Sequence, residues 1–238
     1  MHWSRRTTAH LPKAYIAIRE RLAETAVPSE DAASQPPVSK AVLASALFRI
    51  GSLRFGRFTL SSGKTSAYYL DLRMVPSFPE VYSLVVSAYR EMVLSLGESK
   101  FDLIAGVATA GVAFSSPLAF LLKKPMVYVR REEKGHGLGR LVEGAVRPGL
   151  KALVVDDLAT TGGSLISAVE ALRREAVTVS HAAVLVDRLE GGSDSLRDVG
   201  VKLRSYASVT ELVDSVYGAG KMTKKDYESV MKQVRGAR

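Results

Sequence analysis

Cysteine is absent from the 238 residues, and its absence excludes disulfide bonds, thiolate metal sites and cysteine nucleophiles. Asparagine is also absent and glutamine occurs only at positions 35 and 233, a composition typical of thermophiles. No run of about 18 apolar residues is present, so we expect no membrane-spanning helix and no membrane partner. The first residues lack the apolar segment of an export signal. We therefore expect a cytoplasmic protein.

Acidic residues are outnumbered, because 24 Asp and Glu face 33 Lys and Arg and leave a formal net charge of +9. Such an excess raises the possibility of nucleic-acid binding. Much of the positive charge, however, lies in the terminal segments and in one loop at residues 130–140. A highly anionic small substrate explains that loop equally well, and we expect no nucleic-acid partner.

An apolar content of 47% in a chain of this length is enough for one α/β domain with an appendage. Short apolar segments alternate with helical patterns, which predicts a parallel sheet covered by helices. The predicted strands are 103–107, 126–129, 152–155 and 181–186.

The main domain is predicted to span residues 38–215. Residues 1–37 read as an N-terminal extension, with a helix at Pro12–Thr25 and a linker at 26–37. Residues 216–238 are basic and predict a solvated helical tail.

The first part of the main domain predicts a β-hairpin between two helices. Phe55–Arg73 is rich in β-forming residues around a Ser-Gly-Lys turn, which indicates a hairpin. One helix covers 38–50, and the other begins at a capping box of Ser77 and Glu80 and ends near Gly97. Their apolar stripes are predicted to hold Val42, Leu43, Leu47 and Ile50, and Val81, Val85, Tyr89, Met92 and Leu96.

The most informative stretch is Lys151–Ser164, where an apolar strand leads into two adjacent carboxylates and a turn of small residues. A helical pattern follows, and open α/β sheets bind ligands at such strand ends. An ordinary strand, turn and capped helix is the alternative. Rival phosphate motifs are missing: there is no G-x-G-x-x-G, and Gly63-Lys64-Thr65 lacks the upstream glycine of a P-loop because residue 58 is Phe.

Each residue type in this stretch has a chemical use. Backbone N–H groups of residues 160–164 lie at the predicted helix start, where two glycines and the Thr161 and Ser164 hydroxyls help them bind a phosphate. Asp156 and Asp157 would repel that anion, but they can accept hydrogen bonds from two vicinal hydroxyls, and a nearby Mg²⁺ also fits. A phosphate beside a diol indicates a ribose 5-phosphate.

This stretch resembles the signature of the type I phosphoribosyltransferases, which use phosphoribosyl pyrophosphate (PRPP). The resemblance implies a parallel-sheet core with a small hood, and Mg²⁺ as a cofactor bound mainly through PRPP rather than by protein ligands. The PRPP-binding residues that it implies here are Asp156, Asp157, Leu158, Ala159, Thr160, Thr161, Gly162, Gly163 and Ser164.

A second segment, Val127–Gly144, becomes rich in glycine and positive charge after a predicted strand. Such a loop can order over a pyrophosphate and exclude water, although an exposed linker is the alternative. It is similar to the catalytic loop of the orotate phosphoribosyltransferases, and Ala105–Gly111 looks like the loop that meets the pyrophosphate from below. By this resemblance the pyrophosphate ligands are Arg130, Arg131, Lys134 and His136. Lys134 and His136, with Asp157, would be catalytic, and the first two would reach into the neighbouring subunit of a homodimer.

A third segment, after the strand 181–186, carries Arg188, whose planar guanidinium can bind a carboxylate bidentately. Surface pairing with Asp187 or Glu190 is the alternative. In the resemblance Arg188 binds the orotate carboxylate, Thr160 orients the base, and Tyr68 and Tyr69 resemble the aromatic pair beside the pyrimidine. Neighbours on a strand face opposite sides, so one of the two tyrosines is expected in the core.

One departure concerns the hairpin, where Ser61 stands in place of the Lys of many family members. Lys64 and Arg73 are candidates for the missing charge.

The resemblance implies transfer of ribose 5-phosphate from PRPP to orotate, giving orotidine 5′-monophosphate and pyrophosphate. Two alternatives stay open: a phosphoribosyltransferase for another base, and a non-catalytic regulator that binds PRPP, nucleotide or RNA.

Overall fold

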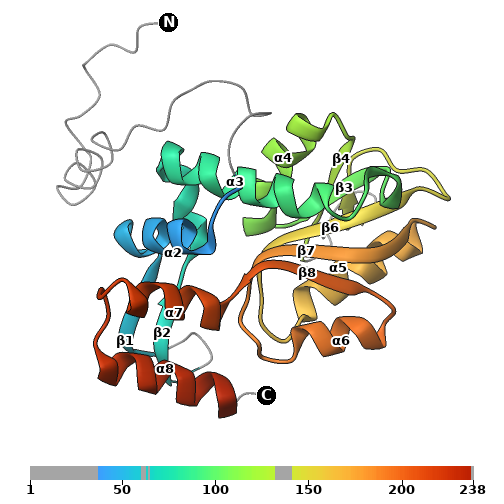
Figure 1. Ribbon diagram of the computed structural model, residues 1–238. Helices are drawn as coiled ribbons and strands as arrows, with labels where there is room; N and C mark the ends of the chain where they lie inside the picture. Colours follow the sequence, from blue (N-terminus) through green and yellow to red (C-terminus); the bar gives the residue numbers. More distant parts are fainter. Residues whose placement is uncertain (1–36, 60–62, 64, 132–140, 237–238) are drawn as a thin grey trace, which may run out of the picture.

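A six-stranded sheet forms the centre of the computed structural model, which describes residues 37–59, 63, 65–131 and 141–236 (Figure 1). The strand order is β5-β4-β3-β6-β7-β8, with β5 antiparallel to β4 and all other neighbours parallel. The predicted mainly parallel sheet is therefore confirmed. Its strands are β3 (Leu103–Val107), β4 (Met126–Val129), β5 (Val142–Glu143), β6 (Lys151–Ala159), β7 (Thr178–Asp187) and β8 (Lys202–Ser208).

Helices cover both faces of this sheet (Figure 1). Helices α3 (Pro79–Leu94) and α4 (Ala110–Leu122) pack on one face, and α5 (Gly163–Arg174) and α6 (Gly192–Asp198) pack on the other. Alternate residues of β6 enter the two cores, Leu153 and Val155 on the first face and Ala152 and Val154 on the second. Successive strand side chains point to opposite faces, which explains why this strand is apolar throughout.

The predicted hood is an antiparallel hairpin of β1 (Leu53–Thr59) and β2 (Thr65–Leu70). Helices α2, α7 and α8 lie beside it at one end of the sheet (Figure 1). The remaining elements are α2 (Lys40–Arg49), η2 (Leu72–Ser77), η3 (Glu98–Lys100), α7 (Val209–Gly218) and α8 (Lys224–Gly236). The predicted N-terminal extension lies outside the described residues, and the domain boundaries stay predictions, although α7 continues across residues 215 and 216.

The basic tail forms the predicted helix, but one of its faces is packed on the protein rather than solvated. Its helix α8 buries Val230 and Val234, and the side-chain oxygen of Gln233 accepts a hydrogen bond of 2.7 Å from the Ala67 N–H on β2. The many charged residues of the tail hid this contact in the sequence. Two valines four residues apart nevertheless lie on the same face of a helix and can form an apolar stripe. The C-terminus therefore supports the hairpin.

Three other details correct the sequence predictions. Helix α3 begins at Pro79 with Phe78 as its N-cap and no side-chain capping bond, so the capping box of Ser77 and Glu80 is wrong; proline at the first position sets the start instead. Val42 is 54% exposed rather than in the core. Strand β6 continues through the acidic pair because β7 pairs with it as far as Ala159.

Within the described residues, no helix is long and apolar enough to cross a membrane.

Candidate active site

Apart from Tyr68 and Tyr69 on the hairpin, the predicted site residues that the structure describes gather at one edge of the central sheet, where four parallel strands end. The loops that follow β3, β4, β6 and β7 begin at Ala108, Arg130, Thr160 and Arg188. Since the strands are neighbours in the order β4-β3-β6-β7, their carboxyl ends lie side by side. Segments far apart in the sequence thus form a single surface.

The acidic pair lies near the end of β6. Asp156 is 6% exposed and Asp157 is half-buried. The Asp157 N–H donates to Asp156 Oδ1 at 2.9 Å, and the Leu158 N–H donates to Asp157 Oδ1 at 2.9 Å. Burial raises the pKa of Asp157, and burial together with the neighbouring charge raises the pKa of Asp156 well above its usual range. Two crowded carboxylates of this kind favour a partner that donates hydrogen bonds or carries positive charge.

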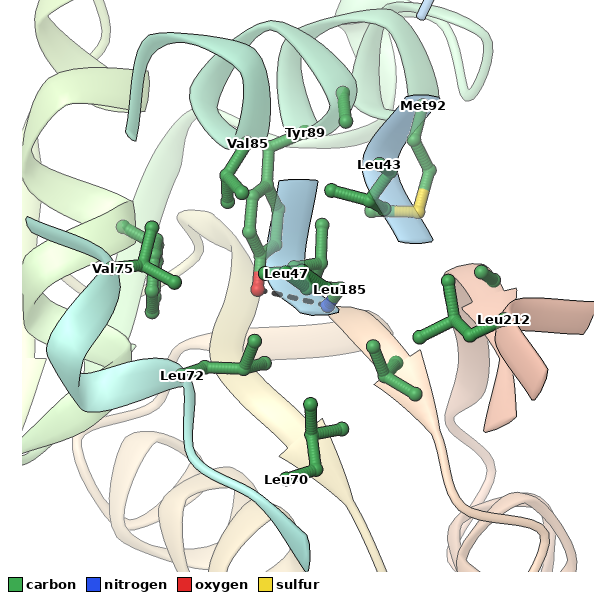
Figure 2. Packing of buried hydrophobic residues seen from close by; sticks show 14 of the residues in the cluster. Leu43, Leu47, Leu70, Leu72, Val75, Val85, Tyr89, Met92, Leu185 and Leu212 are labelled. Carbon is green, nitrogen blue, oxygen red and sulfur yellow. Dashed lines mark hydrogen bonds between the residues drawn. The ribbon is translucent and has the colours of Figure 1, made fainter. Parts of the chain in front are cut away.

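A buried tyrosine holds the backbone at the acidic pair. The Tyr89 hydroxyl, on α3, donates to the Asp156 carbonyl oxygen at 2.6 Å and accepts from the Leu185 N–H at 2.8 Å, the bond drawn in Figure 2. It therefore links β6 to β7 from the covering helix. The sequence placed Tyr89 correctly in the core but gave no sign of this contact; one tyrosine within an aliphatic stripe was the only available signal.

The loop after β6 has the shape expected of an anion site. Helix α5 begins at Gly163, and Gly162 before it has a φ of 87°, a conformation that glycine adopts without strain. The first N–H groups of a helix have no partner within the helix and point outward. Gly192 packs against this loop so closely that a Cβ there would lie 2.6 Å from the Thr160 carbonyl oxygen. The loops after β6 and β7 therefore support each other.

A pocket of about 640 Å³ lies beside the loops after β3 and β4. It is lined by Ala108, Thr109, Val112, Ala113, Tyr128, Arg130 and Arg131. Arg130 also contacts Glu143 at 3.5 Å, and Arg131 is exposed and close enough to lower the pKa of Asp156. The structure thus brings two predicted cations to the acidic edge. Lys134 and His136 lie outside the described residues.

The start of α4, directly after the loop that follows β3, packs on the acidic strand. A Cβ at Gly111 would lie 2.5 Å from the Val155 carbonyl oxygen and 2.9 Å from Asp156 Oδ1. This glycine lets the start of α4 approach β6, and it fixes the pocket next to the acidic pair. The peptide bond between Ala108 and Thr109 in the same loop is cis.

The two hairpin tyrosines face opposite sides, as predicted. Tyr68 is 1% exposed, and its hydroxyl accepts a hydrogen bond of 2.9 Å from Arg188 Nε. Tyr69 is half-buried, and its ring lies 5.7 Å from the Phe58 ring and 4.9 Å from the Arg54 guanidinium. Tyr68 is therefore the core member of the pair, and it belongs to the surroundings of Arg188.

Arg188 also binds Glu190, with Nη2 and Oε1 2.9 Å apart, so the pairing foreseen as the surface alternative is present. The Arg188 side chain is nevertheless only 11% exposed. Sequence reasoning assigned no functional role to Glu190. Its position two residues after the arginine was the available signal.

A positive charge from the hairpin side reaches the acidic pair. Arg73 Nε and Nη2 donate to the two carboxylate oxygens of Asp71 at 2.8 Å each. Element η2, which carries Arg73, contacts β6, and the Arg73 charge offsets a small part of the burial that raises the pKa of Asp157. Of the two candidates for the missing hairpin charge, Arg73 therefore lies near the site, while Lys64 and Ser61 lie outside the described residues.

Metal ligands are few at this edge. No group of three or more His, Cys, Asp or Glu side chains suited to a metal occurs within the part of the chain that the structure describes. Two adjacent carboxylates still fit Mg²⁺, which usually takes one or two protein carboxylates together with substrate phosphates and water.

Comparisons with known proteins agree with this geometry. A family model described as a phosphoribosyl transferase domain matches residues 79–209, which include the loops after β3, β4, β6 and β7. An orotate phosphoribosyltransferase of Sulfolobus acidocaldarius is 49% identical over 164 residues, which cover 69% of this chain and 81% of the relative. The crystal structure of orotate phosphoribosyltransferase from Aeropyrum pernix superimposes with a TM-score of 0.67 and 38% identity, over 76% of this chain and 99% of that one. The structure of Leishmania donovani UMP synthase gives 0.74 and 31%, over 83% of this chain and 42% of that longer one.

Proposed function

Because the chain belongs to the orotate phosphoribosyltransferase family, we propose that it transfers the ribose 5-phosphate of PRPP to orotate. The products are orotidine 5′-monophosphate and pyrophosphate, and the reaction is a step of pyrimidine biosynthesis. The observation that carries this proposal is the meeting of an acidic pair, an anion loop and a nearly buried arginine at one sheet edge.

PRPP spans that edge. Its 5-phosphate binds the N–H groups and hydroxyls of residues 160–164 at the start of α5. Asp156 and Asp157, one buried and one half-buried, accept hydrogen bonds from the ribose hydroxyls, which offset the cost of desolvating these carboxylates. Leu158 and Ala159 carry the backbone from the acidic pair to the loop.

The pyrophosphate occupies the pocket beside Arg130 and Arg131. When the bond between the anomeric carbon and the pyrophosphate oxygen breaks, its electron pair leaves with the pyrophosphate and positive charge develops on the ribose. The cations, together with Lys134 and His136 of the loop, stabilise the leaving group, and the Asp157 carboxylate stabilises the ribose. Bound Mg²⁺, held mainly by PRPP with the acidic pair beside it, would neutralise further pyrophosphate charge.

Orotate lies on the other side of the ribose. Arg188 binds its carboxylate, Thr160 orients the ring, and the half-buried Tyr69 is the aromatic residue that we assign to the flat pyrimidine. N1 of the base then faces the anomeric carbon. The two reacting atoms are held in place by the protein, so the reaction does not depend on a random bimolecular encounter. Arg73 supplies the hairpin charge that Ser61 lacks.

The assembly that we propose is a cytoplasmic homodimer in which Lys134 and His136 serve the neighbouring subunit. Neither a membrane nor a nucleic acid is needed as a partner. A loop that crosses between subunits completes each site only in the dimer.

Replacing Arg188 with leucine tests the choice of base. We expect kcat/KM for orotate to fall about 30-fold, since a charge-assisted hydrogen bond contributes roughly 2 kcal/mol, and KM for PRPP to stay within about twofold. Steady-state kinetics of pyrophosphate release provide the measurement. Arg197→Leu is the matched control, because Arg197 pairs with Asp194 on the exposed face of α6. An unchanged kcat/KM in Arg188→Leu would remove the orotate assignment.

A further inference from the structure

Arg188 is held from two sides by groups that come from different parts of the fold. Nε donates to the Tyr68 hydroxyl on β2 at 2.9 Å, and Nη2 pairs with Glu190 Oε1 at 2.9 Å. The guanidinium carbon also lies 4.9 Å from the centre of the Tyr68 ring. The hairpin and the loop after β7 therefore meet at this one side chain.

These contacts use one edge of the guanidinium. Its five N–H bonds lie in a plane, and the Nε and Nη2 bonds that share an edge point in the same direction. The adjacent edge, between Nη1 and Nη2, presents two parallel N–H bonds that match a carboxylate. Within the described residues, the contacts that hold the Arg188 guanidinium use Nε, toward Tyr68, and Nη2, toward Glu190. A carboxylate can bind the Nη1–Nη2 edge without displacing either partner.

The backbone at Arg188 is fixed as well. Its N–H donates to the Ala159 carbonyl oxygen at 2.9 Å, which ties it to the end of β6. Leu189 has a φ of 60°, and its N–H donates to Asp187 Oδ1 at 2.8 Å. A left-handed conformation at leucine persists only where surrounding contacts determine it. With the backbone set, Tyr68 and Glu190 decide the orientation of the guanidinium.

We propose that Tyr68 and Glu190 are positioning residues that hold the Arg188 guanidinium with its Nη1–Nη2 edge toward the carboxylate of the substrate. This inference rests on the proposed function and adds a specificity element to it. A base without a carboxylate gains nothing from the oriented edge, whereas orotate binds it without reorganisation.

The protonation of Tyr68 agrees with this arrangement. Burial raises its pKa, while the Arg188 charge lowers it and Glu190 raises it. The hydroxyl is therefore protonated at neutral pH, and it accepts from Arg188 while keeping a proton of its own. Tyr68, Arg188 and Glu190 form one cluster in which the total charge is balanced, so the nearly buried cation is satisfied before substrate arrives.

Tyr68→Phe tests the hydroxyl, because it keeps the buried ring and removes one acceptor. We expect KM for orotate to rise about fivefold, with KM for PRPP unchanged. Tyr227→Phe is the matched control, since its hydroxyl bonds a carboxylate, Asp214 Oδ1 at 2.8 Å, on the exposed surface between α7 and α8. In an Arg188→Leu background, Tyr68→Phe should have no further effect on KM for orotate. If Tyr68 had a merely structural role, its effect would instead add to that of Arg188→Leu.

Glu190 provides a second, independent variant. Because Glu190 lies on a loop, its replacement should disturb folding less than replacement of the buried Tyr68. Glu190→Ala should raise KM for orotate by a similar factor, and Glu190→Gln should restore it, because the amide oxygen still accepts from Nη2. Unchanged orotate KM values in both Tyr68→Phe and Glu190→Ala, in a protein that turns orotate over normally, would overturn the positioning role alone. A parent protein without turnover on orotate would overturn the proposed function as well.

Discussion

Replacing Asp157 with asparagine is expected to lower kcat about 10³-fold, roughly 4 kcal/mol of transition-state stabilisation. The carboxylate lies at the end of β6, half-buried, with the Leu158 N–H donating to Oδ1 at 2.9 Å. Asparagine can accept the same hydrogen bond, so the local fold is kept. What is lost is the negative charge beside the ribose that becomes cationic.

The same substitution should make the substrate-free protein more stable at neutral pH. Burial raises the pKa of Asp157 above its value in the unfolded chain. Between these two pKa values the folded state binds more protons than the unfolded state, so the free energy of unfolding falls as the pH rises through that interval. Asparagine does not ionise and avoids that loss. The expected gain is therefore present above the interval and absent below it.

Urea unfolding over a series of pH values from about pH 4, near the ordinary pKa of an Asp carboxyl, to pH 8, combined with initial rates of pyrophosphate release, measures both effects. Asp102→Asn is the matched control. Asp102 is an exposed acid at the opposite edge of the sheet, and it accepts from the Lys151 N–H at 2.8 Å. It should leave kcat unchanged. Parental activity in Asp157→Asn, or lower stability than the parent at pH 8, would contradict the role given to this carboxylate.

Gly111→Ala is expected to reduce kcat/KM about 100-fold and to lower the free energy of unfolding by roughly 1–3 kcal/mol. The added Cβ would lie 2.5 Å from the Val155 carbonyl oxygen and 2.9 Å from Asp156 Oδ1. Backbone atoms at that distance cannot swing away, so α4 must move outward or β6 must shift. Either movement displaces the acidic pair from the pyrophosphate pocket.

Gly218→Ala is the matched control for that variant. A Cβ at Gly218, the last residue of α7, would meet no atom within 4 Å. Alanine there should be neutral or stabilising by up to about 1 kcal/mol. Thermal unfolding and turnover per folded molecule separate a site effect from misfolding. A Gly111→Ala protein with parental stability and turnover would mean that α4 and β6 are not tightly apposed.

Local pattern was sufficient for the parts of the site that lie in one continuous segment. An apolar run followed by Asp156-Asp157 and a small-residue turn has few structural meanings, and the strand–loop–helix unit is present as predicted. Strand ends of a parallel sheet meet at one edge, so the joining of the loops after β4, β6 and β7 also followed from the sequence. Strand periodicity also predicted that one of Tyr68 and Tyr69 lies in the core, and Tyr68 is that residue.

Contacts between segments that are distant in the sequence could not be predicted from local sequence pattern. The Tyr89 hydroxyl reaches Asp156 and Leu185 through tertiary packing, and a stripe of core residues gives only its burial (Figure 2). The packed face of α8 was hidden by a charge-rich composition, since Val230 and Val234 are buried but Tyr227 and Met231 beside them are only partly buried. The capping box failed because Pro79 sets the helix start more strongly than a favourable pair of side chains.

The most direct test of the account is pyrophosphate release from PRPP and Mg²⁺, with orotate, uracil, hypoxanthine and adenine supplied in parallel. The account predicts turnover with orotate and none above background with the three bases that lack a carboxylate. Turnover with another base would keep the PRPP site and contradict the roles of Arg188, Tyr68 and Glu190. Binding of PRPP without turnover on any base would contradict the enzymatic function itself.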